Sequence, residues 1–205
     1  MSTVATLSLD EDFADPRPFP LFARWYADAE NANIPDFNAL TLATSTPDGH
    51  PSARIVLLRG FDERGFAFYT NYESRKGREL EANPHAAMVM FWSLFQRQVR
   101  VEGSISKLTP EESDYYFSNR PAGHRLGALV SPQSRVIPSR AYLEHRMEEL
   151  AKEYQGQDVP RPEHWGGYRL VPHVVEFWQG RENRLHDRLR YRLAESGWII
   201  ERLAP

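Results

Sequence analysis

Hydrophobic positions along the chain follow two periods, and together they predict both helices and strands. Apolar side chains such as Phe22, Trp25 and Ala29 recur at helical spacing. Patterns of this kind, together with capping residues, predict helices over 21–33, 74–82, 109–119 and 139–154. Short apolar or alternating runs predict strands over 39–45, 53–58, 66–70, 86–92, 98–108, 168–171, 174–178, 188–193 and 198–203.

Two of these strands carry different patterns. The strand over 53–58 is nearly all apolar, which is typical of a strand buried on both faces. The strand over 98–108 alternates, with Val99, Val101 and Ile105 facing one way. Because runs of adjacent strands are flanked by helices, we expect an α+β fold built on a mostly antiparallel sheet or small barrel.

The domain organisation is simple. The chain has 205 residues, which suits one domain with a hydrophobic core. Residues 1–17 are expected to form a flexible acidic arm that contains Asp10, Glu11 and Asp12. Residues 18–205 are expected to form the single domain, because neither a repeat nor a linker interrupts them.

Composition narrows the function classes. A net charge of −3 does not indicate nucleic-acid or membrane-surface binding. The chain has no cysteine, so disulfides and thiolate chemistry are excluded, and its seven histidines are too scattered to predict a metal site. The N-terminus lacks the pattern of a secretory signal, and no apolar run approaches the ~20 residues of a membrane helix. A cytoplasmic location is therefore expected.

Arginine-rich clusters are the strongest chemical signal. Arg54 and Arg59 bracket the apolar strand, and solvated strand ends are the simpler interpretation of that pair. Arg75 and Lys76 open the helix after the strand that holds Tyr69 and Thr70. Cations at a helix N-terminus oppose its dipole, so a bound phosphate would explain them, although an exposed basic turn is the alternative.

The C-terminal cluster is harder to explain as a plain surface. Arg184, His186 and Arg188 alternate, so on a strand they would share one face and repel one another unless an anion lay opposite. Asp187 would point to the other face. A polar segment over 131–135, by contrast, is more simply interpreted as a loop.

An ordered set of short motifs resembles the pyridoxamine 5′-phosphate oxidase family. The segments R-L-H-D-R at 184–188, E-F-W-Q-G at 176–180 and the C-terminal W-I-I-E-R-L-A-P resemble that family's C-terminal signature. The upstream segments R-x-V-L-L-[KR], F-Y-T-N, S-R-K-G, R-Q-V-x-V-x-G and P-Q-S follow in the family's order. The resemblance covers roughly residues 19–205.

The resemblance implies an FMN-binding split β-barrel that works as a homodimer, with FMN at the subunit interface. Residues that would bind FMN from one protomer are Arg54, Ile55, Val56, Leu57, Tyr69, Thr70, Arg75, Lys76 and Gln98. The partner protomer would add Gln133, Ser134, Trp178 and Arg188. The C-terminal segment would serve dimerisation and substrate binding.

The resemblance also implies the reaction. Pyridoxine or pyridoxamine 5′-phosphate would be oxidised to pyridoxal 5′-phosphate, with O₂ as electron acceptor and H₂O₂ as product. The substrate phosphate would meet Arg59, Tyr116, Arg120 and His124, while the catalytic candidates Arg184 and His186 would lie over the pyridine ring. Two cationic clusters suit two phosphate esters.

The chain departs from the family pattern in three respects. Arg59 stands where lysine is usual, His124 stands where serine is common, and the arm lacks a basic-aromatic segment that some members fold over the substrate. Three alternatives remain: a flavin oxidase of the same scaffold acting on another substrate such as a phenazine precursor, a non-catalytic flavin- or B6-phosphate-binding protein, and a generic β-barrel interaction protein.

Overall fold

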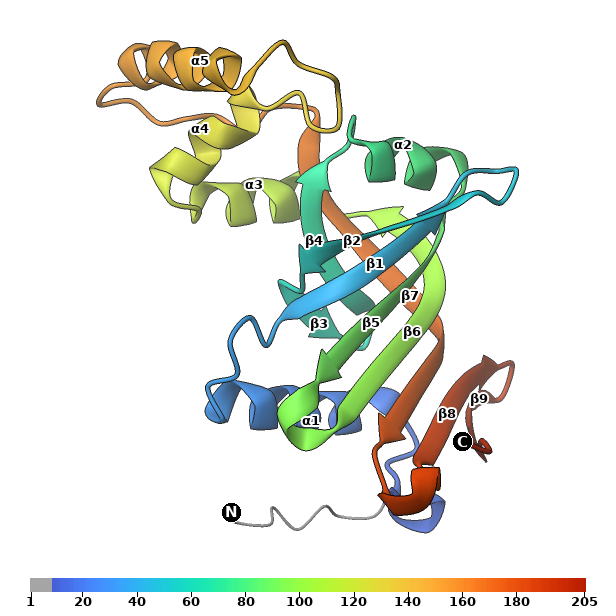
Figure 1. The fold of residues 1–205 in the computed structure, drawn as a ribbon. Coiled ribbons are helices and arrows are strands. Elements are labelled where there is room, and N and C mark those ends of the chain that lie inside the picture. Colours follow the sequence, from blue (N-terminus) through green and yellow to red (C-terminus); the bar gives the residue numbers. More distant parts are fainter. Residues whose placement is uncertain (1–8) are drawn as a thin grey trace.

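A curled antiparallel sheet forms the centre of the protein, and helices cover its ends (Figure 1). The computed structural model describes residues 9–205. The strands are β1 (Ala39–Ser45), β2 (Pro51–Leu57), β3 (Gly60–Asp62), β4 (Gly65–Asn71), β5 (His85–Trp92), β6 (Arg97–Lys107), β7 (Trp165–Gln179), β8 (Asp187–Ala194) and β9 (Gly197–Arg202). The α-helices are α1 (Pro18–Asn31), α2 (Arg75–Ala82), α3 (Pro110–Ser118), α4 (Ala122–Val130) and α5 (Arg140–Glu153). Short 3₁₀ turns are η1 (Glu11–Phe13), η2 (Ser93–Phe95) and η3 (Glu182–Arg184).

The long strand β7 organises the sheet. The strand order is β2-β1-β5-β6-β7-β4-β3, and the β8–β9 hairpin also pairs with β7. Along its other edge β7 pairs with β4 through its first half and with β8 through its second half. Trp165 and Trp178, near the two ends of β7, are separated by thirteen residue steps, so roughly 40 Å of strand lies between them.

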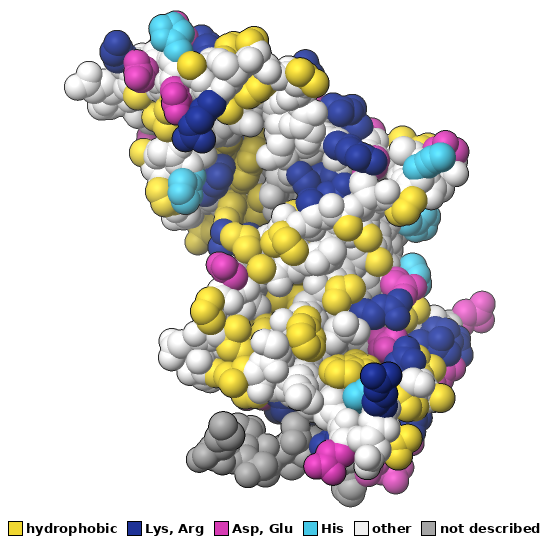
Figure 2. All heavy atoms as spheres, viewed as in Figure 1, with side chains coloured by type: hydrophobic (Ala, Val, Ile, Leu, Met, Phe, Trp, Pro, Cys, Tyr) yellow, Lys and Arg dark blue, Asp and Glu magenta, His cyan; other side chains and the backbone are white. Residues whose placement is uncertain are grey.

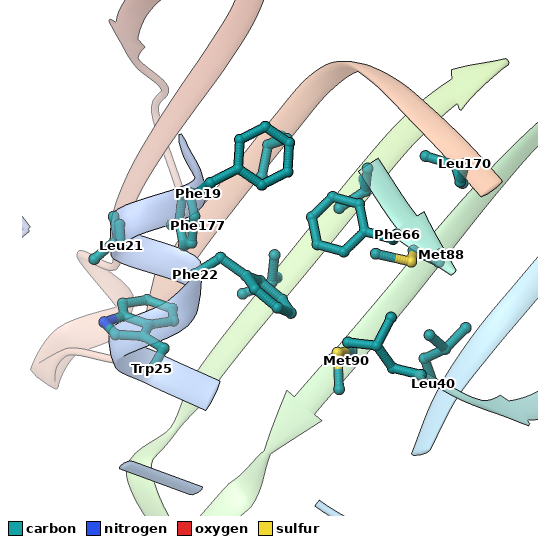
Figure 3. Close-up of a cluster of buried hydrophobic side chains, with 14 of the residues drawn as sticks. Phe19, Leu21, Phe22, Trp25, Leu40, Phe66, Met88, Met90, Leu170 and Phe177 are labelled. Carbon is teal, nitrogen blue, oxygen red and sulfur yellow. The ribbon is translucent and has the colours of Figure 1, made fainter. Parts of the chain in front are cut away.

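Helix α1 closes the barrel from below and supplies much of the core. Figure 3 shows Phe22 and Trp25 of α1 facing Phe66, Phe177 and the strand residues around them. Phe22 meets Phe66 edge to face at 4.9 Å, and Trp25 meets Phe177 at 5.3 Å. Each fully buried ring contributes roughly 1.5–3 kcal/mol by leaving water, so this cluster fixes where the strands sit.

Local signals predicted the helix boundaries well. Ser74 caps α2, Ser139 caps α5, and Thr109 forms the expected capping box with Glu112 at α3. Helix α1 begins three residues earlier than predicted, at Pro18, because proline is well tolerated in a first helical turn.

The prediction that the apolar strand is buried on both faces is wrong. Strand β2 lies at the edge of the sheet, paired only with β1, and the side chain of Ile55 is 63% exposed. The predicted strands over 168–171 and 174–178 are instead one strand, β7, in which His173 is an extra residue that bulges opposite the Glu102–Gly103 step of β6. A Cβ on Gly103 would lie 2.1 Å from the Val171 carbonyl oxygen, so the bulge requires glycine.

The N-terminal arm falls partly outside the described residues, which begin at residue 9. Leu9 is buried, and the Tyr191 hydroxyl donates to the Asp15 carbonyl oxygen at 3.0 Å. The flexibility of the whole 1–17 arm stays a prediction. Within the described part of the chain, no helix is long and apolar enough to cross a membrane.

Candidate active site

A cavity of about 550 Å³ lies between the barrel and the α3–α4 block. Figure 2 shows it as a recess with basic side chains nearby. Eleven predicted site residues line it, namely Ile55, Val56, Leu57, Arg59, Tyr69, Thr70, Lys76, Tyr116, Arg120, His124 and Gln133. Asn119, Pro121 and Trp165 also line it and were not predicted. We call this region the cavity end.

Lys76 is the buried cation of the cavity end. Its ammonium donates to Gln133 Oε1 at 2.8 Å, Thr70 Oγ1 at 3.0 Å and Ser74 Oγ at 3.4 Å. Lys76 makes no ion pair within residues 9–205. Burial, reinforced by the charge of Arg54, lowers its pKa to about 8. A bound anion would stabilise an ammonium held in this way, so the charge and burial of Lys76 suit an anionic ligand.

Arg54 and Arg75, both expected to bind FMN, do not line the cavity and share the buried carboxylate of Glu79. Arg75 Nε donates to Glu79 Oε1 at 2.8 Å, and Arg54 reaches Oε2 at 3.3 Å. Burial alone would raise the pKa of Glu79, but hydrogen bonds from Ser52, Thr44 and Arg75 outweigh it and hold the pKa at about 2. Glu79 therefore stays ionised and orients both arginines beside the cavity.

The opposite wall of the cavity is an aromatic stack. Tyr69 lies 3.8 Å from Tyr116, ring centre to ring centre, and 5.7 Å from Trp165, with all three rings nearly parallel. The Arg120 guanidinium lies over Trp165 at 4.6 Å. Its Nη1 is buried without a hydrogen-bond partner, and burial lowers the pKa of Arg120. A second donor is thus held ready for an acceptor.

A second group of predicted residues lies at the far end of β7, around the β8–β9 hairpin, namely Gln98, Trp178, Arg184, His186 and Arg188. We call this region the hairpin end. Trp178 pairs with Gln98 in the sheet, and its ring lies 4.6 Å from the His186 ring. Arg188 Nε donates to the buried carboxylate of Glu176 at 2.8 Å. Hydrogen bonding to Glu176 raises the pKa of Arg188.

The prediction that Arg184, His186 and Arg188 share one strand face is wrong. Strand β8 begins at Asp187, and Arg184 belongs to the preceding turn η3. Asn183 and Arg184 have φ of 55° and 61°, in the left-handed region that ends an extended pattern. Glu176 of the same chain neutralises Arg188, so the positive charge of Arg188 does not require an anionic ligand.

Within one chain, two glutamines lie apart from the residues with which they were grouped. Gln133 was expected from the partner, but it contacts Lys76 and Thr70 of its own chain. Gln98 was grouped with the cavity residues, but it lies beside Trp178 at the hairpin end. Ser134 follows Gln133 in a loop, with φ of 70°. Only long-range packing could reveal these placements.

Trp165 is the main residue that the sequence did not predict. Its signal is the Trp-Gly-Gly run at 165–167. A Cβ on Gly166 would lie 2.1 Å from the Tyr72 hydroxyl oxygen, and one on Gly167 would lie 2.8 Å from the Tyr69 ring. The backbone at Gly166 and Gly167 therefore lies close against Tyr72 and Tyr69, and only glycine allows this packing beside Trp165 in the cavity wall.

A curled antiparallel sheet flanked by helices, with a cavity lined by cationic side chains at one end, defines a split-β-barrel protein. Two family models cover the chain, "Pyridoxamine 5′-phosphate oxidase" over residues 27–153 and "Pyridoxine 5′-phosphate oxidase C-terminal dimerisation region" over residues 165–205. The chain therefore belongs to the pyridoxamine 5′-phosphate oxidase family, a family of oxidoreductases.

Relatives agree over nearly the full length. Proteins named pyridoxine/pyridoxamine 5′-phosphate oxidase from Gloeothece citriformis and Paraburkholderia phymatum are 58% and 55% identical, covering 96% and 100% of this chain and 92% and 100% of their own. The crystal structure of PhzG from Burkholderia lata with tetrahydrophenazine-1-carboxylic acid is 34% identical, covers 100% of both chains and has a TM-score of 0.93. An FMN-binding protein from Nostoc punctiforme, 18% identical over 92% of this chain and 98% of its own, has a TM-score of 0.73 and supports the fold.

Proposed function

We propose that this protein is an FMN-dependent homodimeric oxidase that converts pyridoxine or pyridoxamine 5′-phosphate to pyridoxal 5′-phosphate. One observation carries the proposal beyond family membership. A single cavity contains two separate cationic positions, Lys76 and Arg120, and neither has a carboxylate partner within the described residues. Two phosphate esters bound side by side, one of FMN and one of the substrate, satisfy both.

The residues of the cavity end fit the FMN phosphate. Lys76 supplies a buried ammonium, Thr70 adds a hydroxyl, and Arg75 lies at the first turn of α2, where the helix N-terminus favours an anion. The exposed apolar side chain of Ile55 and its neighbours on β2 suit the flat isoalloxazine ring. FMN, when bound, supplies two-electron oxidation of the substrate carbon, with O₂ as the electron acceptor.

The chain's own residues bind and orient the substrate. Arg120, Arg59 and His124 line the other part of the cavity and bind the substrate phosphate. Tyr116 lines the same part of the cavity and stacks on Tyr69, so its hydroxyl can also meet that phosphate. Arg184 and His186 come from the partner protomer and orient the pyridine ring over the flavin. His186 can also accept or donate a proton there.

The homodimer is needed because one chain cannot assemble this set. The cavity end contains the first residue of β7, while Trp178 and His186 lie about 40 Å of strand away. A second copy brings its hairpin end to the cavity end of the first. The C-terminal dimerisation model over 165–205 covers this hairpin. The cytoplasmic location stays a prediction that cell fractionation tests.

A second candidate is oxidation of a phenazine precursor, favoured by the high similarity to PhzG over the whole chain. The ligand named for PhzG carries a carboxylate, which could also accept from Arg120 Nη1. A phosphate offers more acceptor oxygens than a carboxylate, and Arg59 and His124 line the cavity together with Arg120, so this set of donors favours the phosphorylated substrate.

The direct test mixes the purified FMN-loaded protein with pyridoxine 5′-phosphate or pyridoxamine 5′-phosphate in air. We expect pyridoxal 5′-phosphate and H₂O₂ from both, and ammonia from the amine. A dephosphorylated substrate should turn over far more slowly. Equal turnover of pyridoxine and its phosphate would refute the assignment of Arg120, and no product from either phosphate would refute the proposed function.

A further inference from the structure

The turn that carries Arg184 is under backbone strain. Asn183 and Arg184 are consecutive non-glycine residues with φ of 55° and 61°. Such residues persist only when their surroundings impose the conformation. The turn η3 has no buried residue to anchor it, so the support must come from polar contacts.

Four charged residues of alternating sign provide such contacts. Arg181 Nε donates to Asp187 Oδ2 at 2.7 Å, and Arg202 Nη1 donates to Asp187 Oδ1 at 3.2 Å. Arg202 Nε also donates to Glu11 at 2.9 Å, and its Nη2 donates to the Leu9 carbonyl oxygen at 2.8 Å. We call Glu11, Arg202, Asp187 and Arg181 the clasp. It ties both ends of the turn to β9 and to the N-terminal segment, which lie together in Figure 1.

The clasp reaches the His186 ring directly. The backbone N–H of Arg181 donates to His186 Nδ1 at 3.0 Å. A neutral imidazole whose Nδ1 accepts a hydrogen bond carries its proton on Nε2. The other side of the ring packs on Trp178. Arg181 therefore sets both the orientation and the tautomer of His186, and Asp187 in turn holds Arg181.

We propose that Asp187 and Arg202 are positioning residues, which act through the clasp to hold Arg184 and His186 in the geometry that oxidation requires. This inference rests on the proposed function. The two residues touch neither cavity nor flavin site in the chain. Their side chains contact Arg181 and Glu11, and their effect reaches the substrate through the turn.

A purely stabilising role does not explain the arrangement. The side chains of Glu11 and Arg202 are 43% and 40% exposed. Ion pairs at such positions are screened by solvent and contribute little to folding stability. Their placement at the two ends of a strained turn gives them a geometric role, since small misplacement of a catalytic group can cost on the order of 100-fold in rate.

The test uses Asp187→Asn in the full-length, FMN-loaded dimer, with Glu201→Gln as the matched control. Glu201 pairs with Arg190 and Arg192 on the same hairpin but lies outside the clasp. Anaerobic reduction of the bound FMN by pyridoxamine 5′-phosphate is followed by flavin absorbance. For Asp187→Asn we expect the limiting reduction rate to fall roughly 10- to 100-fold. FMN content and the KM for substrate should stay close to wild type, and the melting temperature should fall no further than it does in Glu201→Gln.

Two further variants keep the outcome decisive. Arg202→Gln should slow flavin reduction, and Arg202→Lys should recover part of the rate because it restores the charge facing Asp187 and Glu11. Glu11→Gln, at an exposed position, should fold normally and slow reduction by a few fold. Equal rates for Asp187→Asn and Glu201→Gln, or a loss explained wholly by lost FMN or unfolding, would overturn the clasp. A wild-type protein whose FMN is not reduced by the substrate would instead overturn the proposed function.

Discussion

Two cations that line the cavity differ from two arginines of the hairpin end in whether a carboxylate of the same chain pairs with them. At the cavity end, the buried Lys76 and the half-buried Arg120 have no carboxylate partner within residues 9–205, and Arg120 Nη1 is itself buried. At the hairpin end, Arg188 and Arg202 each contact a carboxylate of their own chain. Figure 2 shows acidic and basic side chains intermixed at the lower end, beside the β8–β9 hairpin.

This difference indicates that the cavity end binds anionic ligands, whereas the hairpin end orients side chains. Unpaired buried cations are costly without a ligand, so the cavity end gains stability when an anion binds. Paired cations are already satisfied, so the hairpin end contributes geometry more than charge. Four predictions test this division, beginning with the largest expected effect.

The largest effect should come from Arg184→Ala at the hairpin end. Arg184 is a predicted catalytic residue. Unlike Arg181 and Arg188 of the same region, it makes no ion pair with a carboxylate within residues 9–205. We expect kcat to fall roughly 100- to 1,000-fold, as for loss of one oriented donor, while FMN stays bound. Steady-state kinetics and the flavin absorbance of the purified protein measure both. Wild-type turnover would contradict the assigned role.

Lys76→Met at the cavity end should weaken FMN instead. Losing one charge-assisted hydrogen bond is worth about 1.5–3 kcal/mol, so FMN affinity should fall roughly 10- to 150-fold. The FMN-free variant should be at least as stable as the FMN-free wild type, because the buried ammonium is gone. Fluorescence titration and thermal unfolding check the two parts. A variant that keeps FMN tightly would exclude Lys76 from the phosphate site.

The pH dependence of the FMN-free protein follows from the same lysine. The pKa of Lys76 is about 8 in the folded protein, whereas a lysine in the unfolded chain has its usual pKa of 10.5. Between these values the unfolded chain binds the proton and the folded chain does not, so this group makes stability rise from pH 8 to pH 10.5. FMN affinity should fall over the same range as the amine loses its charge. Lys76→Met should flatten both the stability profile and the FMN-affinity profile between pH 8 and pH 10.5. Identical slopes in the variant and the wild type would contradict the lowered pKa of Lys76.

The smallest effect should come from Glu176→Gln at the hairpin end. The Glu176 carboxylate accepts from Arg188 at 2.8 Å and from Arg100 at 3.2 Å. Since both arginines are partly exposed, we expect the unfolding free energy to fall by about 1–2 kcal/mol and FMN affinity to fall only a few fold. Glu102→Gln, which removes the other partner of Arg100, is the control. Chemical denaturation should separate the two variants.

Features set by a few neighbouring residues were predictable from the sequence. Ser74, Thr109 and Ser139 each cap the helix that they were expected to begin, because capping depends on hydrogen bonds within one turn. The family and the α+β split barrel were also predicted correctly, since they rest on ordered motifs and on strand periodicity.

Features set by long-range packing were not predictable. The apolar run at 53–58 has the composition of a buried strand, but β2 lies at the sheet edge, where its apolar side chains are free to meet a ligand or a second copy. The alternation of Arg184, His186 and Arg188 looked like a strand until two left-handed residues placed Arg184 in a turn. The positions of Gln98 and Gln133 depend on which strands and loops pack together.

The most direct test of a site shared between protomers mixes two inactive variants. Arg120→Met disables the cavity end, and Arg184→Ala disables the hairpin end. If each site joins the cavity end of one protomer to the hairpin end of its partner, a mixed dimer has one site with both changes and one with neither. After subunit exchange at equal concentrations, we expect about a quarter of wild-type turnover to return, because half of the dimers are mixed and each has one intact site. No recovery in a sample shown to contain mixed dimers would contradict the shared site.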